Sequence, residues 1–229
     1  PTKEMLLATG FNRNHKITQE GGVIDEEYRL EYVTDRTNTF GKTYLGLTFE
    51  CAKCHDHKYD PISQKDYYSA FAFFNQVNEK GLVGDIQLAS LADPPRMQIT
   101  NDDVRRILKF VNKKDKDPVP VMIMRDSSVV RPTHLLKRGA YDAPGEIVGF
   151  NMPESIFPFD SVRLSKNRLG LAKWLLDKNN PMTARVFVNR VWQDFFGRGI
   201  VKTSGDFGMQ GELPTHPELL DWLALDFVN

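Results

Sequence analysis

The stretch FECAKCHDHKYDP, residues 49–61, holds both cysteines of this 229-residue chain and two of its five histidines. Cys51, Cys54 and His55 follow the pattern Cys-x-x-Cys-His. Two cysteines placed at random, with a histidine directly after the second, reach this spacing on the order of 2 times in 10,000, so the motif calls for a chemical cause.

The spacing is that of covalent haem attachment in c-type cytochromes. Each thiol forms a thioether with one vinyl group of the haem, and the adjacent imidazole binds the iron from the same side. The motif therefore predicts one covalent haem c, with Cys51, Cys54 and His55 binding the cofactor and His55 as the proximal iron ligand.

Three alternative roles for the cysteine pair stay open. A thioredoxin-like dithiol requires a βαβ context, but here a helical pattern precedes the motif. For a structural zinc site, the spacing Cys-x2-Cys-His-x-His is too short to place all four ligands around one tetrahedral ion, although His15 could contribute from a distance. The pair could also form a disulfide or stay unmodified.

The opposite side of the iron needs a separate ligand, because His57 is tethered beside His55. We expect His57 to bind a haem propionate or Asp60, with solvent exposure as the alternative. For the distal position we favour His15, with Met97 as the alternative and open coordination as a third possibility. The remaining candidates have simpler structural roles: His134, His216, Met122 and Met124.

The pattern of the flanking chain predicts a mainly α fold with a small β element. Helical spacing of apolar residues indicates helices at 25–45 and 63–77, the second opened by a capping box of Ser63 and Asp66. Residues 10–22 resemble a loop. Further helices are expected at 101–111, 165–178, 182–196 and 216–228, with short strands near 119–150.

Local signals also predict where several of these elements begin and end. Thr100 or Asn101 is expected to cap the helix at 101–111, and Gly197 to end the helix at 182–196. Thr215 and Glu218 match a capping box, and residues 142–146 match a turn between strands. The helix at 63–77 carries more aromatic residues than one ordinary face needs, and we expect some of them to pack on a porphyrin and the rest on the helix at 25–45: Tyr67, Tyr68, Phe71, Phe73 and Phe74.

Two helical subdomains are expected, with the boundary at Pro94-Pro95. The first, 1–93, holds the c-type-cytochrome-like motif, and the second, 94–229, holds the short strands.

Thirty basic and thirty acidic residues give no net charge, so nothing favours a nucleic-acid partner. No apolar run reaches the length of a membrane span. The chain begins without Met or a signal sequence and ends in a helical pattern, so a piece of a longer polypeptide is expected.

Two long segments resemble known families. ATGFNRNHKITQEGGVIDEEYRLEYVTDRTNTFGKTYLGLTFECAKCHDHKYDPISQKDYYSAFAFFNQV, residues 8–77, resembles the planctomycete-type cytochrome-c-like family of uncharacterised domains. PVMIMRD at 120–126, RPTHLLKRGAYDAPGE at 131–146 and NRLGLAKWLLDKNNPMTARVFVNRVWQDFFGRGIVKTSGDFGMQGELPTHPELLDWLALDFV at 167–228 resemble the uncharacterised domain that follows it in the same polypeptides. The resemblance implies haem c, export to the periplasm, cell surface or exterior, and often an upstream cytochrome module; here the first domain would lack its N-terminal part.

These observations favour electron transfer by a haem c module, with a redox protein or an upstream cytochrome as partner. The alternatives are a haem-dependent extracellular or periplasmic oxidoreductase and a non-haem structural or metal-binding module. In the second subdomain, Arg185 and Asn189 share a helix face, which we expect to be solvated, or to line a cleft with Asp206. The glycines of 205–211 fit no nucleotide-binding spacing, and no hydrolase signature is present.

Overall fold

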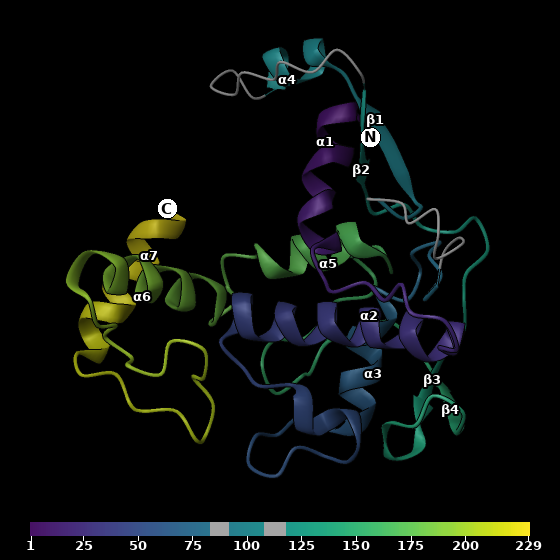
Figure 1. Cartoon of the computed structure of the whole chain (residues 1–229). Helices are drawn as coiled ribbons and strands as arrows, with labels where there is room; N and C mark the ends of the chain where they lie inside the picture. Colours follow the sequence, from purple (N-terminus) through teal and green to yellow (C-terminus); the bar gives the residue numbers. More distant parts are fainter. Residues whose placement is uncertain (83–91, 108–117) are drawn as a thin grey trace. The chain divides into compact units, whose positions relative to one another are not determined.

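The computed structural model of the chain describes residues 1–82, 92–107 and 118–229 (Figure 1). The fold is mainly helical, with 42% helix and 9% strand, and the two sheets formed by the described residues are small and antiparallel. The expected fold class is therefore confirmed at this level. Within the described ranges, no helix combines the length and the apolar character that crossing a bilayer requires.

The chain forms two compact units, each assembled from two separate segments. Unit 1 consists of Pro1–Val33 and Gln76–Arg131, and unit 2 consists of Thr34–Asn75 and Pro132–Asn229. These units do not follow the division at 93/94, so the ranges 1–93 and 94–229 stay a prediction about modular organisation. The two units are described separately below.

Unit 1 holds short elements. Its helices are α1 (Lys3–Ala8) and α4 (Asn101–Ile107), and a 3-10 turn spans Thr9–Arg13. Strands β1 (Arg96–Ile99) and β2 (Val119–Met122) pair antiparallel. The sequence patterns did not predict α1 or β1, and residues 108–111 of the expected helix lie outside the described residues. Helix α2 (Asp25–Phe40) begins in unit 1 and ends in unit 2.

A buried arginine organises the interior of unit 1. The guanidinium of Arg13 donates to the carbonyl oxygens of Ile123 and Pro94, both at 3.3 Å. Its Nε lies 3.6 Å from Oε2 of Glu79, and the two side chains are 2% and 1% exposed. Residues 14–22 are irregular, as expected, but residues 10–13 belong to a 3-10 turn, and Arg13 itself is part of the core.

Tyr32 connects two loops of unit 1 to α2. Its hydroxyl donates to the carbonyl oxygen of Gly81 at 2.7 Å and accepts from the backbone N–H of Thr18 at 2.9 Å. Burial raises the pKa of Tyr32 above its ordinary value. The phenol therefore stays a donor, which keeps the bond to Gly81 intact.

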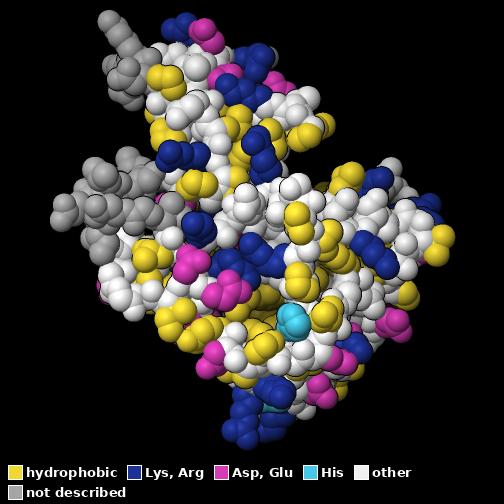
Figure 2. Space-filling view, turned by 90° about the vertical axis from the view of Figure 1, so that its right-hand side faces the viewer, with side chains coloured by type: hydrophobic (Ala, Val, Ile, Leu, Met, Phe, Trp, Pro, Cys, Tyr) yellow, Lys and Arg dark blue, Asp and Glu magenta, His cyan; other side chains and the backbone are white. Residues whose placement is uncertain are grey.

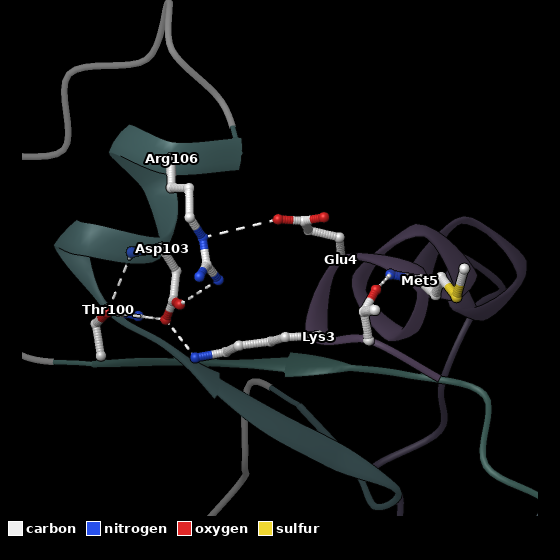
Figure 3. A network of polar contacts seen from close by, with 7 residues as sticks. Lys3, Glu4, Met5, Thr100, Asp103 and Arg106 are labelled. Carbon is white, nitrogen blue, oxygen red and sulfur yellow. Dashed lines mark hydrogen bonds and ion pairs between the residues drawn. The ribbon is translucent and has the colours of Figure 1, made fainter.

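A polar network opens α4 (Figure 3). The Thr100 amide and hydroxyl donate to Oδ2 of Asp103 at 2.9 and 2.8 Å, and the Asp103 amide donates back to the Thr100 hydroxyl at 3.2 Å. Lys3 of α1 also binds Oδ2, and Arg106 lies 3.5 Å from Oδ1. The predicted cap at Thr100 is confirmed as a reciprocal capping box.

This network should make stability depend on acid pH. The hydrogen bond from Lys3, followed by those from Thr100, holds the pKa of Asp103 well below its usual range. The folded-state pKa lies below the unfolded value of about 3.9, so the stabilisation is full above that pH and is lost as pH falls through the folded pKa. We expect Asp103→Asn to lower the urea concentration at the unfolding midpoint at neutral pH. The difference between the midpoints of the parent and the variant should shrink below about pH 3.

The exposed neighbour Asp102, whose side chain is 92% exposed, provides the control. Asp102→Asn should change the urea midpoint little at either pH, because exposed ion pairs contribute little. A midpoint gap for Asp103→Asn that stays constant from neutral to strongly acid pH would contradict the assignment.

In unit 2, helix α3 (Gln64–Ala72) begins with the predicted capping box of Ser63 and Asp66. The helix ends five residues before the expected Val77. The amides of Phe73 and Phe74 bond three residues back, which tightens the chain out of the α-helix. The Asn75 amide still bonds the Phe71 carbonyl at 3.0 Å, and the Asn75 side chain donates to the Thr133 hydroxyl at 2.9 Å, which ties the end of this region to β3.

The aromatic face of this helical region is buried, as predicted. The five aromatic residues are at most 4% exposed: Tyr67, Tyr68, Phe71, Phe73 and Phe74. The Phe74 ring lies 5.8 Å from that of Phe40 in the C-terminal part of α2, which confirms packing on that helix. Whether any of these rings also contacts a porphyrin stays a prediction.

The strands expected near 119–150 include a hairpin of unit 2. Strand β3 (Thr133–Leu136) pairs antiparallel with β4 (Pro144–Val148), and Thr133 lies opposite Val148. The turn between the strands contains a 3-10 segment, Lys137–Gly139. The turn predicted around residues 142–146 is placed too late, because the strand already begins at Pro144.

Three helices complete unit 2: α5 (Arg168–Leu175), α6 (Thr183–Phe196) and α7 (Pro217–Val228). The predicted left-handed cap of α6 is present at Gly197, with φ 76°. The predicted capping box of Thr215 and Glu218 is wrong. The cap of α7 is His216, without a side-chain cap bond, while the Thr215 hydroxyl donates to the Ile200 carbonyl at 3.2 Å.

Figure 2 shows one face of the molecule, where basic and acidic side chains lie interspersed among apolar ones over much of the surface. This mixing agrees with the equal numbers of acidic and basic residues in the sequence.

Candidate functional site

The cysteine motif of unit 2 forms one short 3-10 turn. The turn spans Glu50–Lys53, and the amides of Cys54 and His55 both approach the Cys51 carbonyl, at 3.3 and 3.5 Å. Ala52 is fully buried, whereas Cys51 and Cys54 are free and exposed. The buried alanine packs the turn against the protein interior, while the two thiols stay accessible to a reactant.

Helix α3 fixes the position of this turn. The carbonyl oxygen of Lys53 accepts from the Gln64 side chain at 2.9 Å and from the Tyr68 hydroxyl at 3.0 Å. The backbone amide of Gln64 donates to Oδ1 of Asp56, just beyond the motif, at 2.8 Å. The turn is therefore held by polar bonds on both sides of Cys54.

His55 has one ring nitrogen engaged. Its Nδ1 lies 2.6 Å from the Asp56 carbonyl oxygen, and the residue is exposed. Because a carbonyl can only accept, Nδ1 carries the proton in this contact. The lone pair then belongs to Nε2, the arrangement that metal-binding histidines commonly adopt.

His57 is built into the fold. Its side chain is 2% exposed, and Nδ1 accepts from the Asp60 amide at 2.9 Å. The expected contact with Asp60 is therefore present, and the alternative of an exposed His57 is wrong. A bond from His57 to a haem propionate stays a prediction.

The β3–β4 turn lies against the second thiol. A Cβ added to Gly139 would come within 2.9 Å of Cys54 Sγ, and the φ of +72° at Gly139 also disfavours other residues. The absence of a side chain here lets the hairpin approach the thiol closely and leaves the Sγ atom its place.

The predicted distal ligands belong to unit 1, whereas the motif belongs to unit 2. His15 stacks on Tyr32, with ring centroids 4.5 Å apart, and its Nδ1 lies 2.9 Å from the Lys16 carbonyl oxygen. Met97 is half-buried in β1, opposite Val121. Their roles as iron ligands stay predictions.

The remaining histidines and methionines considered as ligands have structural positions. His134 lies in β3, with Nδ1 3.0 Å from the Gly145 carbonyl oxygen, and His216 caps α7. Met124 is 2% exposed, in agreement with a core role. Among residues 1–82, 92–107 and 118–229, no group of three or more His, Cys, Asp or Glu side chains is arranged to hold a metal ion.

The polar cleft considered for the second subdomain does not form from the expected residues. Asn189 is fully buried and bonds both backbone groups of Val201, at 2.8 and 2.9 Å. Arg185 bonds Asp221 of α7 at 2.6 Å, and Asp206 accepts from the Gly208 amide at 2.9 Å. The solvated face expected for Asn189 is also wrong, since this side chain clamps a loop.

Comparison with known families identifies two segments of the chain. Residues 1–79 match PSCyt2, a protein of unknown function (DUF1549), and residues 167–229 match PSD1, a protein of unknown function (DUF1553). Both are planctomycete-type families. Comparisons with curated proteins and with solved structures found no match. The matches agree with the two resemblances seen in the sequence and leave haem binding untested.

Proposed function

We propose that this chain carries one haem c, attached through Cys51 and Cys54 with His55 as proximal ligand, and transfers electrons within a larger exported polypeptide. One observation carries the proposal: two free, exposed thiols, on a 3-10 turn and at its C-cap, are followed by an exposed imidazole. A haem held in this way would supply a one-electron iron couple.

The chain's own residues would orient the attachment. Gln64 and Tyr68 hold the turn through the Lys53 carbonyl, so the backbone between the two cysteines is held in place. The Asp56 carbonyl fixes the ring of His55 and makes its Nε2 more basic, as outer hydrogen bonds do for ligating histidines. The donor set fits the group chemically.

The decisive experiment is export of the chain in a bacterial host together with its haem-attachment machinery. We expect the intact mass to exceed the chain mass by one haem, and the pyridine haemochrome spectrum to be that of two thioether bonds. Cys51→Ala and Cys54→Ala should each leave one vinyl group free and shift the spectrum, and the double variant should carry no haem.

Lys58→Ala serves as the control, because Lys58 is exposed within the same stretch and should not affect attachment. A co-expressed c-type cytochrome verifies that the machinery works. An unmodified mass alongside a loaded control protein would refute the proposal and favour the structural or metal-binding alternative.

The distal ligand can be tested on the loaded protein. If His15 is the sixth ligand, His15→Ala should let CO bind the reduced haem while the covalent attachment persists; Met97→Ala tests the alternative in the same way. CO binding by the unmutated protein would mean an open position, which favours the haem-dependent oxidoreductase over electron transfer.

A further inference from the structure

Unit 2 contains a cavity of about 600 Å³. This volume lies in the range of small-molecule sites. Its walls are mainly apolar, with Ile62, Ile156, Met182 and Phe207 among the lining residues, and Asp60 is the acidic group that lines it. Cys51, Cys54 and His55 do not line this cavity, so it is separate from the thiols of the candidate haem site.

The carboxylate of Asp60 is incompletely bonded. Its side chain is 5% exposed, and Oδ1 accepts from the Met209 amide at 2.7 Å. Oδ2 lies 3.5 Å from His57 Nδ1, a distance that could indicate an ion pair. However, Nδ1 already accepts a hydrogen bond from the Asp60 backbone amide. This nitrogen therefore carries a lone pair rather than a proton and cannot donate to Oδ2. Among the contacts of the described residues, Oδ2 receives no hydrogen bond.

The wall that carries Phe207 is held in place before any ligand arrives. The Phe207 amide donates to the Gly46 carbonyl at 2.6 Å, and the next two amides bond Asp206 and Asp60. A Cβ at Gly208 would come within 2.5 Å of Asp60 Oδ2. Only glycine therefore fits beside the carboxylate at this point of the loop. A preorganised wall loses little entropy when a ligand binds.

Apolar walls around one buried, half-bonded carboxylate favour a ligand of opposite charge. A buried carboxylate is costly without a partner, and a charged donor supplies a stronger hydrogen bond than a neutral one. The ring of Phe207 offers an additional surface that attracts cations. We propose that this cavity binds an organic amine with an apolar body, whose ammonium group pairs with Asp60 Oδ2.

The test uses three probes with one body and three charges: 4-phenylbutylamine, 4-phenylbutanol and 4-phenylbutyrate. Each is titrated into the purified chain by calorimetry. The amine should bind about tenfold or more tighter than the alcohol, as expected for a hydrogen bond to a charged partner. The carboxylate probe should bind most weakly, because it repels Asp60.

Asp60→Asn keeps an acceptor for the Met209 amide and removes the charge, so it should abolish the preference for the amine over the alcohol. Asp194→Asn removes an exposed charge elsewhere in unit 2 and should leave the preference unchanged. Ile156→Trp fills the cavity from another lining residue without altering Asp60, and should weaken binding of both the amine and the alcohol.

Equal affinity for amine and alcohol in the parent would overturn the proposal, as would an amine preference that survives Asp60→Asn. Binding unaffected by Ile156→Trp would place the probes elsewhere and overturn it too. If Asp60→Asn does not fold, the probe series on the parent and on Ile156→Trp still decides. Haem attachment is not required for any of these titrations, so they are independent of the proposed electron transfer.

Discussion

Replacing Arg13 with methionine should lower the free energy of unfolding of unit 1 by about 3–5 kcal/mol, the range for removing one partner of a buried ion pair. Glu79 would stay in the interior, where its side chain is 1% exposed. The carbonyls of Ile123 and Pro94 would also lose their donor. Burial already raises the pKa of Asp93, and the charge of Arg13 opposes that rise. Removal of Arg13 would therefore leave a second carboxylate, that of Asp93, without this favourable charge.

Hydrogen exchange measured by mass spectrometry localises this effect. All three tryptophans lie in unit 2, at 174, 192 and 222, so fluorescence does not report on unit 1 directly. Peptides of unit 1 should exchange faster in Arg13→Met. The pair Arg13→Met with Glu79→Met should recover part of the loss, and Arg105→Met, at a side chain 76% exposed, should change little. Unaltered exchange in Arg13→Met would show that the ion pair does not stabilise the unit.

Phe71→Ala should destabilise unit 2 by about 3–5 kcal/mol, the usual range for truncating a buried phenylalanine. The residue is 2% exposed, and its ring lies 5.7 Å from that of Tyr68 and 6.3 Å from that of Tyr67. Tyr68 also holds the Lys53 carbonyl of the cysteine turn, so the cavity would reach the support of the motif.

Tryptophan fluorescence during urea unfolding measures this loss, because every tryptophan reports on unit 2. Phe195→Ala is the matched control, since Phe195 is 80% exposed and truncating it leaves no cavity. A midpoint for Phe71→Ala equal to that of Phe195→Ala would mean that this aromatic cluster contributes nothing to the core.

Local patterns predicted most of the helices of this protein. Helices at 168–175, 183–196 and 217–228 follow from apolar periodicity, and the α3 cap follows from Ser63 and Asp66. The motif at Cys51, Cys54 and His55 could also be recognised directly, because its chemistry depends on residues that are adjacent in sequence. These features require no knowledge of distant contacts.

Features that depend on distant partners could not be predicted. Arg13 follows glycine and asparagine in an apparently polar loop, and only its bonds to residues 79, 94 and 123 make it a core residue. Asn189 shows the same limit, because its burial depends on a loop twelve residues away. The cavity beside Asp60 is lined from five separate parts of unit 2, and no local spacing marks it.

The interleaved units set an order for folding during synthesis. Residues 34–75 belong with Pro132–Asn229, so after the ribosome has added Asn75, the 56 residues 76–131 must be made before the second segment of unit 2 begins. At roughly 5–20 residues per second, that interval lasts roughly 3–11 seconds. The apolar rings of α3 therefore emerge well before their cover at Phe150 and Phe159 is synthesised. Throughout this interval the nascent chain presents both thiols and an uncovered aromatic surface, the state in which chaperones would meet it.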